Sequence, residues 1–411
     1  MVGRQRVVVV GAGAAGSAAA AALVQVLPQL EVVVTGREDR LPYNRTTVNK
    51  GLLTGAVDDQ DVVLPGLRGL AVTWQLGQPA RSVDAAARIV ELASGSSIAA
   101  DAVVLATGAD PCPLPAAIEP AAASRVLEMR TASDSFRLLE ALRHGAGHIL
   151  LADAGLLGAE TAGSLRALGV NVTLVDPADR PLSTHLGATA ASWVQDQHVR
   201  AGVDLRTGTA VVAVETAGGG VAVTLDDGSM MRADAVVASL GVTPAIDWLR
   251  DSGISLSNGV PVGSGMRVLD HPGIYAAGDL AAVPGPGGIL LRTEHWGVAL
   301  TQGRTAAASV LADLGLADAS DGAASAEPPG YSMYVHGTKL TIVGWTHDAI
   351  DEAVVHGAVG EQRFTMALVD RQGRISAAVG VGGARVANRL RGLIARRGEI
   401  GEIGQVLEKT A

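Results

Sequence analysis

The N-terminal part of the chain shows a valine run, a set of spaced glycines and then a stretch rich in alanine. Residues 7–10 are all valine, and consecutive β-branched residues are typical of a buried strand. Gly11, Gly13 and Gly16 follow, and glycine disfavours one continuous helix here. We therefore interpret residues 7–26 as strand, loop and helix. A signal peptide or a membrane span is rejected, despite the uncharged run.

The same alternation recurs in the middle of the chain. Residues 148–151 have the pattern of a buried strand, residues 159–168 that of a helix, and residues 170–175 that of the next strand. Two such strand–loop–helix units predict an α/β chain. We expect two Rossmann-like nucleotide-binding domains, each a doubly wound sheet in three layers.

The pattern changes beyond residues 315–330, which are rich in Ala, Asp, Ser and Pro and are interpreted as a linker. Residues 339–345 and 362–369 are expected to be strands, residues 370–373 a hairpin turn, and the chain end a basic helix. A small C-terminal α+β domain should therefore follow. The expected domains are residues 1–115 with 245–325, residues 116–244, and residues 326–411.

Each glycine of the first loop has a physical role in binding a dinucleotide. Gly11 permits a tight turn, Gly13 lets the backbone approach a pyrophosphate, and Gly16 lets the helix pack closely on the strand. The helix then presents unpaired N–H groups to the phosphates. Glu38 is the nearest carboxylate past the second strand at 32–34 and is the expected ligand of a ribose. The residues expected around the pyrophosphate are Gly11, Gly13, Ala14, Ala15 and Gly16.

Composition narrows the possible functions. Hydrophobic residues make up 48% of the 411 residues, which favours a globular protein over a disordered one. A formal net charge of −9 argues against a nucleic-acid-binding protein, which needs a basic face. The single cysteine, Cys112, excludes an intramolecular disulfide and fits a reducing compartment, so we expect a cytoplasmic location. The histidines show no metal-ligand spacing, and no metal is expected.

Basic residues gather near the C-terminus of this acidic chain. They are Arg385, Arg389, Arg391, Arg396 and Arg397. A helix carrying them could receive an acidic protein partner, or it could simply present a solvated face.

With these motifs in place, the sequence resembles the FAD-dependent pyridine-nucleotide oxidoreductases over nearly its whole length. Within them it is similar to the ferredoxin, putidaredoxin and rubredoxin reductases, which are also similar to apoptosis-inducing factor. Residues 41–50 match the family segment Pro-Tyr-x-Arg-Pro-Pro-Leu-Ser-Lys and retain its cations as Arg45 and Lys50. The resemblance implies that both lie along the flavin, where a cation stabilises the anionic reduced ring.

Further segments carry the resemblance. Residues 105–109 match the family's Ala-Thr-Gly strand end, and residues 127–134 match its Leu-Arg-Thr-x-x-Asp segment. Residues 275–280 match its second FAD signature, and residues 294–296 match its Glu-His-Trp helix start. The indole of Trp296 is expected to pack against the flavin. The resemblance implies FAD contacts for Arg45, Lys50, Ala80, Thr107, Gly108, Arg130, Gly278, Asp279, Glu294, His295 and Trp296.

The second loop departs from the family pattern at its first glycine. Gly155 and Gly158 fill the second and third positions, but the first is Asp153, whose carboxylate would repel phosphates. Asp176 ends the next strand, where an acid accepts hydrogen bonds from the ribose and disfavours NADPH. The resemblance also implies that Glu160 and Gly241 lie near the nicotinamide. The residues expected to hold NADH are Gly155, Gly158, Glu160, Asp176 and Gly241.

Other positions also depart from the family. Arg37 stands where the family has its ribose acid, and Thr46 and Thr47 replace a proline pair. Ser332 replaces the tryptophan that faces the flavin and the acceptor protein in the family. In this respect the chain departs from a standard ferredoxin reductase.

The predicted activity is transfer of electrons from NADH through FAD to an external acceptor. The resemblance assigns catalytic roles to Lys50, Glu160 and Trp296. One cysteine leaves no redox dithiol, so electrons should pass from the flavin directly to an external acceptor. The resemblance makes a small iron–sulfur ferredoxin the expected acceptor, ahead of oxygen or a quinone. No nucleic-acid or membrane partner is expected, and the chain is expected to be a monomer or a homodimer.

The departures leave two alternatives open. One is an FAD-binding protein of the same fold whose NADH reductase activity is impaired or lost. Such a protein would act as a small-molecule oxidase or as a binding or structural partner. The other is a colourless protein with neither cofactor. Visible colour and bleaching by NADH separate the three hypotheses.

Overall fold

The chain forms two compact units, each built from segments that are separated in the sequence. The computed structural model describes residues 5–285, 289–318 and 328–408. Unit 1 comprises residues 1–44, 60–110 and 242–326, and unit 2 comprises residues 45–59, 111–241 and 327–411. Residues 45–59, which the sequence assigns to the first domain, thus group with unit 2. The three-domain division stays a prediction, and the linker expected at 315–330 lies largely outside the described residues.

The centre of unit 1 is a five-stranded parallel sheet with the strand order β20-β7-β1-β2-β3. Its strands are β1 (Arg6–Val10), β2 (Glu31–Thr35), β3 (Val72–Gln75), β7 (Ala102–Leu105) and β20 (Ile274–Ala276). The valine run forms β1, and all four valines are buried. A parallel strand covered on both faces has no solvent side, so a continuous apolar run fits this central place. The strand predicted at 7–10 is confirmed.

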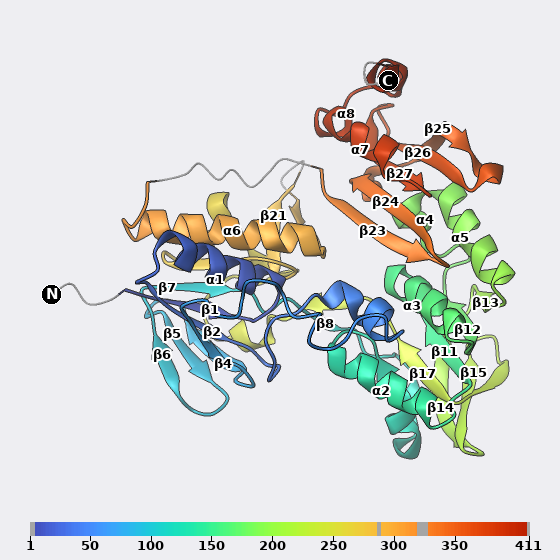
Figure 1. Cartoon of the computed structure of the whole chain (residues 1–411), viewed down its shortest axis with the longest axis horizontal. Helices are drawn as coiled ribbons and strands as arrows, with labels where there is room; N and C mark the ends of the chain where they lie inside the picture. The colour runs from blue at the N-terminus through green and yellow to red at the C-terminus, as the bar shows by residue number, and fades with distance from the viewer. Residues whose placement is uncertain (1–4, 286–288, 319–327, 409–411) are drawn as a thin grey trace. The chain divides into compact units, whose positions relative to one another are not determined.

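Helices cover one face of this sheet, and a small antiparallel sheet covers the other. Helices α1 (Ala14–Val26) and α6 (Trp296–Asp313) lie side by side on the first face (Figure 1). Strands β4 (Ala80–Asp84), β5 (Ile89–Leu92) and β6 (Ser97–Ala99) pack apolar side chains into the same core from the other face. The remaining strands are β8 (Ala109–Pro111), β18 (Val242–Pro244), β19 (Val260–Pro261), β21 (Ala281–Pro284) and β22 (Leu290–Leu291). Across the described ranges, no helix is both long enough and apolar enough to cross a bilayer.

Close packing of α1 on α6 depends on Gly303. A Cβ at this position would lie 2.1 Å from the backbone oxygen of Ala15, so the two helices would have to separate. We expect Gly303→Ala to destabilise unit 1 by about 1–3 kcal/mol, the usual cost of overpacking. Gly297→Ala is the matched control on the same helix, because its Cβ would make an ordinary 3.5 Å contact. That change should be neutral or stabilise by up to about 1 kcal/mol. Chemical unfolding measures both, and equal effects would contradict this account.

Unit 2 contains a second five-stranded parallel sheet, with the order β10-β17-β11-β12-β13. Its strands are β10 (Val126–Glu128), β11 (His148–Ala152), β12 (Asn171–Asp176), β13 (Asp204–Thr207) and β17 (Ala235–Ala238). Its helices are α2 (Ala132–Arg143), α3 (Leu156–Ala167), α4 (Ser183–Leu186) and α5 (Ala188–Arg200). A further sheet is formed by β9 (Ala117–Ile118), β14 (Val211–Ala217), β15 (Gly220–Leu225) and β16 (Met230–Ala233). The second predicted strand–loop–helix–strand unit is confirmed, with its helix starting earlier because Gly155 is the N-cap.

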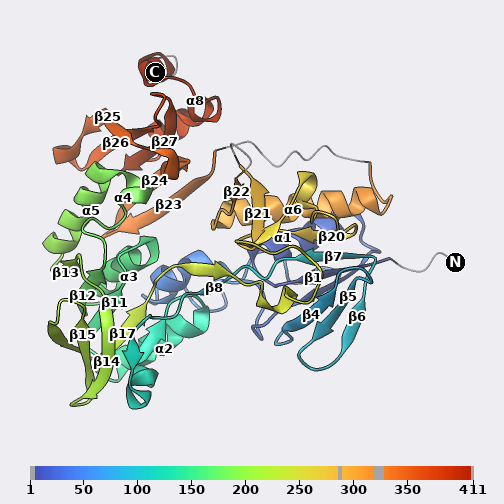
Figure 2. The same cartoon turned by 180° about the vertical axis from the view of Figure 1, so that it is seen from behind.

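The C-terminal part of unit 2 is an antiparallel sheet with the order β23-β24-β27-β26-β25. Its strands are β23 (Gly330–Val335), β24 (Thr338–Gly344), β25 (Asp351–Ala358), β26 (Arg363–Val369) and β27 (Ile375–Val381). The predicted turn at 370–373 is confirmed, because the Asp370 carboxylate accepts from the N–H groups of Gln372 and Arg374. Helices α4 and α5 lie beside this sheet (Figure 2), and Trp193 of α5 packs edge-on against Phe364 of β26.

The prediction of one basic helix at the chain end is wrong. The segment forms α7 (Arg385–Arg389), α8 (Arg391–Ala395) and α9 (Ile403–Glu408). Helix α8 ends because Arg397 takes a left-handed φ of 52° and its guanidinium turns back to Asp348 (2.7 Å). Arg396 pairs with Glu402 (2.6 Å). The guanidinium groups of Arg396 and Arg397 therefore form ion pairs within unit 2. Docking of an acidic partner on this segment stays a prediction.

Candidate dinucleotide-binding sites

The first glycine loop joins β1 to α1, and backbone contacts surround two of its glycines. The N–H of Gly11 donates to the oxygen of Thr35 (2.8 Å), and Gly11 has a φ of 115°. A Cβ on Gly11 would lie 2.1 Å from the Ala106 oxygen, and one on Gly16 would lie 1.9 Å from the Gly11 oxygen. Both positions therefore require glycine for the fold itself.

Gly13 has a different environment. It is the N-cap of α1 in extended backbone, and a Cβ there would meet nothing within 4 Å. The missing side chain leaves open space over the first turn of the helix, where the N–H groups have no intrahelical partner. These amides and the positive end of the helix dipole fit a pyrophosphate.

Ala15 connects this loop to two other motifs of unit 1. A Cβ on Gly278 would lie 3.0 Å from the Ala15 methyl group, and one on Gly303 would touch the Ala15 oxygen. The N–H of Gly278 also donates to Oε1 of Gln302 (2.8 Å). Segments 11–16, 278–279 and 302–303 thus meet at the carboxyl edge of the sheet. Gln302 is absent from the predicted site residues, although Gln302 and Gly303 follow the Glu-His-Trp segment as part of the same family resemblance.

The predicted ribose ligand lies just past β2. The carboxylate of Glu38 accepts a hydrogen bond from the hydroxyl of Tyr43 (2.8 Å). Its neighbour Arg37 pairs with Asp110 (2.6 Å) on an exposed surface. The tyrosine therefore orients Glu38, and the ribose contact itself stays a prediction.

Helix α6 begins at the predicted Glu-His-Trp segment. Nδ1 of the N-cap His295 accepts from the N–H of Gly297 (3.2 Å), and burial lowers the pKa of this imidazole while the charge of Asp279 opposes the shift. Glu294 pairs with Arg292 (2.8 Å). Trp296 is half-buried in the first turn.

The other predicted FAD contacts of unit 1 lie at strand ends. They are Ala80 at the start of β4, Thr107 and Gly108 after β7, and Gly278 and Asp279 after β20.

Lys50 and Glu160 form a largely buried ion pair within unit 2. Nζ of Lys50 lies 2.9 and 2.8 Å from the two carboxylate oxygens, and the Glu160 side chain is only 9% exposed. Lys50 belongs to a π-helical turn (Val48–Leu52) and Glu160 to α3. The carboxylate also accepts from the N–H of Tyr334 (2.8 Å) and the amide of Asn49 (3.3 Å). Two predicted catalytic residues are thus in direct contact, and sequence reasoning missed the other two partners.

The segment that carries Lys50 is joined to α2 and to the residues just before it by hydrogen bonds from side chains to backbone oxygens. The hydroxyl of Ser135 donates to the oxygen of Val48 (2.8 Å), and Arg45 donates to the oxygen of Arg130 (3.3 Å). The predicted FAD ligands Arg45, Lys50 and Arg130 therefore lie on one connected part of unit 2.

Gly241, predicted near the nicotinamide, has a φ of 81°, and its oxygen accepts a hydrogen bond from the Cys112 N–H (3.0 Å).

The second loop repeats the backbone of the first loop although it begins with an aspartate. The N–H of Asp153 donates to the Val175 oxygen (2.8 Å), as that of Gly11 donates to its neighbouring strand. Asp153 has a φ of 84°, and a Cβ on Gly158 would lie 2.0 Å from the Asp153 oxygen. Aspartate tolerates this left-handed region better than most residues. The loop geometry typical of dinucleotide binding therefore survives the substitution.

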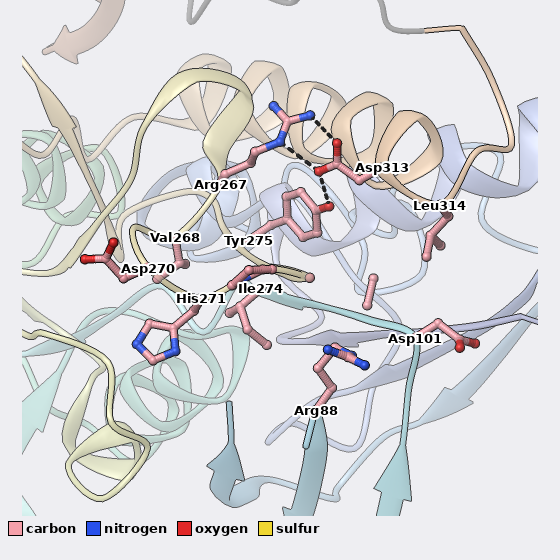
Figure 3. A pocket seen from close by; sticks show the side chains of 13 residues that line it. Arg88, Asp101, Arg267, Val268, Asp270, His271, Ile274, Tyr275, Asp313 and Leu314 are labelled. Carbon is pink, nitrogen blue, oxygen red and sulfur yellow. Dashed lines mark hydrogen bonds and ion pairs between the residues drawn. The ribbon is translucent and has the colours of Figure 1, made fainter. Parts of the chain in front are cut away.

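A pocket of about 500 Å³ lies at the amino edge of the unit 1 sheet, opposite the carboxyl edge that carries the first glycine loop (Figure 3). It opens at the amino ends of β7 and β20, whereas dinucleotides bind beyond carboxyl ends. Its wall carries a network in which Arg267 and the hydroxyl of buried Tyr275 both donate to Asp313 (2.7 and 2.6 Å). The Arg267 hydrogen bond lowers the pKa of Asp313. Among the residues that the structure describes, no group of three or more His, Cys, Asp or Glu could hold a metal ion.

Two glycine loops, each between a parallel strand and a helix, define a class of proteins that bind two dinucleotides with one chain. Residues 5–303 match the model of the family described as pyridine nucleotide-disulphide oxidoreductase. The chain belongs to this family, although its one cysteine provides no disulfide.

The named relatives include reductases of electron-transfer systems. The ferredoxin–NAD(+) reductase component of the p-cumate 2,3-dioxygenase system of Pseudomonas putida is 33% identical over 71% of this chain and 71% of its own length. Rhodocoxin reductase of Rhodococcus erythropolis is 31% identical over 88% of this chain and 82% of its own. The crystal structure of the ferredoxin reductase for the CYP199A2 system from Rhodopseudomonas palustris has a TM-score of 0.87 and 26% identity, covering 96% of each chain.

Proposed function

We propose that this chain is an FAD-dependent oxidoreductase that passes electrons from NADH to a small iron–sulfur protein of the ferredoxin type. The observation that carries the proposal is the pair of glycine loops in a chain whose relatives, over most of its length, are named ferredoxin–NAD(+) reductases. A cytoplasmic location and a monomeric or homodimeric state accompany the proposal as predictions.

The residues of unit 1 fit the adenine-dinucleotide part of FAD. Gly13 leaves the approach to the helix amides open, while Gly11 and Gly16 keep the turn tight. Bound FAD supplies the chemistry that accepts two electrons from NADH and delivers them singly. The protein's part is to position the cofactor and to set the charge around it. We assign the positioning to the first loop and the positive charge to Lys50.

Lys50 brings a cation that Glu160 holds in one geometry. Because the carboxylate also accepts from Tyr334 and Asn49, the ammonium group has little freedom to leave its place. A preorganised cation stabilises negative charge that develops during reaction. The same glutamate lies in the helix that follows the second loop, so it is our candidate for the nicotinamide side of the site.

Electrons are proposed to leave the flavin without a protein disulfide. The chain has one cysteine, so a redox dithiol cannot form within it. Ser332, which replaces the family's tryptophan, is exposed on β23 opposite Thr341. The acceptor contact is therefore expected to differ from that of family members that carry the tryptophan.

Anaerobic titration with NADH tests the proposal directly. We expect a yellow protein whose visible flavin band bleaches with NADH, and an affinity for NADPH about 10-fold lower because Asp176 would repel its 2′-phosphate. Dithionite provides the reference for complete reduction. After reduction by one equivalent of NADH, two or more equivalents of an oxidised [2Fe–2S] ferredoxin, each accepting one electron, should restore the yellow colour. A yellow protein that dithionite bleaches and NADH does not would contradict the proposal.

Asp153 favours one alternative function. A carboxyl group over the second loop suits an FAD protein with impaired NADH binding that oxidises a small molecule or serves as a binding partner. The same titration separates the two, because this alternative retains the colour and lacks the bleaching. A colourless preparation that takes up no added FAD would contradict both.

A further inference from the structure

The Asp153 side chain occupies the space over the second glycine loop, whereas the corresponding space over the first loop is open. Its Oδ2 lies 2.7 Å from the position that a Cβ on Gly155 would take, whereas a Cβ on Gly13 would meet nothing within 4 Å. Gly155 and Gly13 hold equivalent places, as the N-caps of α3 and α1. A carboxyl group therefore lies where a pyrophosphate would approach the backbone.

Asp176, at the end of β12, is the second acid at this loop. It is 4% exposed, and its oxygens accept from the N–H groups of Ala154 (2.7 Å) and Ala178 (2.8 Å). These two backbone donors hold the Asp176 carboxyl group in place at the second loop. Burial, followed by the hydrogen bond to Asp176 and its charge, raises the pKa of Asp153 to about 7.

The other elements that the structure describes around Asp153 bring no further unpaired charged group to it. The N–H of Gly155, the N-cap of α3, donates to the Asp153 carboxyl group and so lowers its pKa, against the effect of burial. The acid Glu160 of α3 is already paired with Lys50 at 2.8 Å. From the end of β17, Ser239 contributes an uncharged hydroxyl that donates to the Asp153 carbonyl oxygen (3.3 Å). The charge at this loop therefore changes with one proton.

We propose that Asp153 controls the affinity of the second loop for NADH through its proton. The protonated acid is neutral and bonds to Asp176, which leaves the helix amides to the pyrophosphate. The ionised acid adds a negative charge beside Asp176 and repels the phosphates. Affinity should therefore be highest in mildly acidic solution and fall as the pH rises through neutrality. The inference rests on the proposed function, since it requires this loop to hold NADH.

Calorimetric titration of the FAD-loaded full chain with NAD⁺ tests this inference without turnover. Between about pH 6 and about pH 8.5, the dissociation constant of the wild type should rise about 5- to 30-fold. Asp153→Asn and Asp153→Gly should bind NAD⁺ with little pH dependence, and glycine suits the left-handed φ at this position. Asp196→Asn removes an exposed acid of α5 as a control for net charge and should behave like the wild type.

A second measurement follows the proton itself. The infrared carbonyl band of a protonated carboxyl group should be present below neutral pH, disappear above it, and be missing from Asp153→Asn at all pH values. The proposed role of Asp153 is overturned if wild type and Asp153→Asn share one pH profile of affinity while both bind NAD⁺, and the proposed function then survives. Failure of every variant, Asp153→Gly included, to bind NAD⁺ at either pH would overturn the proposed function as well.

Discussion

Replacing Gly11 by alanine is expected to abolish FAD binding and to destabilise unit 1 by about 2–5 kcal/mol. A side chain at a φ of 115° costs about 1–2 kcal/mol, and the clash of the new Cβ with the Ala106 oxygen at 2.1 Å adds an overpacking cost of about 1–3 kcal/mol. The loop must open to relieve that clash, which separates the helix amides from the ligand they would hold. Guanidinium unfolding of the apoprotein measures the loss of stability, and flavin absorbance after gel filtration measures the loss of FAD binding.

Gly13→Ala is the control that separates the needs of the fold from those of the ligand. Its backbone is extended and the new methyl group would meet no protein atom within 4 Å, so the apoprotein should be destabilised by less than about 1 kcal/mol. FAD binding should nevertheless weaken, because the methyl group enters the space that the pyrophosphate requires. If both variants kept full flavin content, the first loop would not be the FAD site.

Removing the cation of the Lys50–Glu160 pair should have the largest effect on unit 2. Lys50→Met leaves a carboxylate that is 9% exposed without its counter-ion, and breaking a buried pair in this way costs about 3–5 kcal/mol. The loss should be largely recovered in the double variant Lys50→Met with Glu160→Gln, because the neutral amide still accepts from the Tyr334 N–H. Chemical unfolding at neutral pH measures the cycle, and the coupling expected for direct partners is about 2–3 kcal/mol.

An exposed pair of the same unit is the control for that experiment. Arg206 and Asp204 lie 2.9 Å apart, but their side chains are 54% and 49% exposed, so Arg206→Met should cost less than about 1 kcal/mol. The flavin of the Lys50→Met variant should also be reduced more slowly by NADH, because the variant lacks the ammonium group that is assigned to stabilise the reduced flavin. Equal stability losses for the two variants would contradict a special role for the buried pair.

The two glycine loops could be predicted because their determinants are local. Four valines in a row suit a strand buried on both faces, and glycines at 11, 13 and 16 satisfy a turn, a ligand and a helix contact within a few residues. The second loop was predictable in the same way, even with Asp153 in place of a glycine. The hairpin turn at 370–373 likewise follows from an aspartate and a glycine three residues apart.

The assembly of the sites could not be predicted from the residues alone. Glu160 meets Lys50 from 110 positions away and the Tyr334 amide from 174 positions away, so no local pattern reports their contact. The basic residues near the C-terminus read as one helix, because a helical pattern does not reveal that Arg397 will turn back to Asp348. The contacts of Gly278 and Gly303 with Ala15 depend in the same way on tertiary packing, that of Gly303 on how α6 packs on α1.

By itself, the sequence determined the two strand–loop–helix units, the family and the absence of a redox dithiol, since these depend on residue type and short spacing. The tertiary structure alone decided that a buried carboxylate holds the Lys50 ammonium group and that the Asp153 carboxyl group lies over Gly155, where burial raises its pKa. The physical reason is that the charge of a buried group is set by its neighbours and by its distance from water. Both are fixed only when segments far apart in the chain fold against each other.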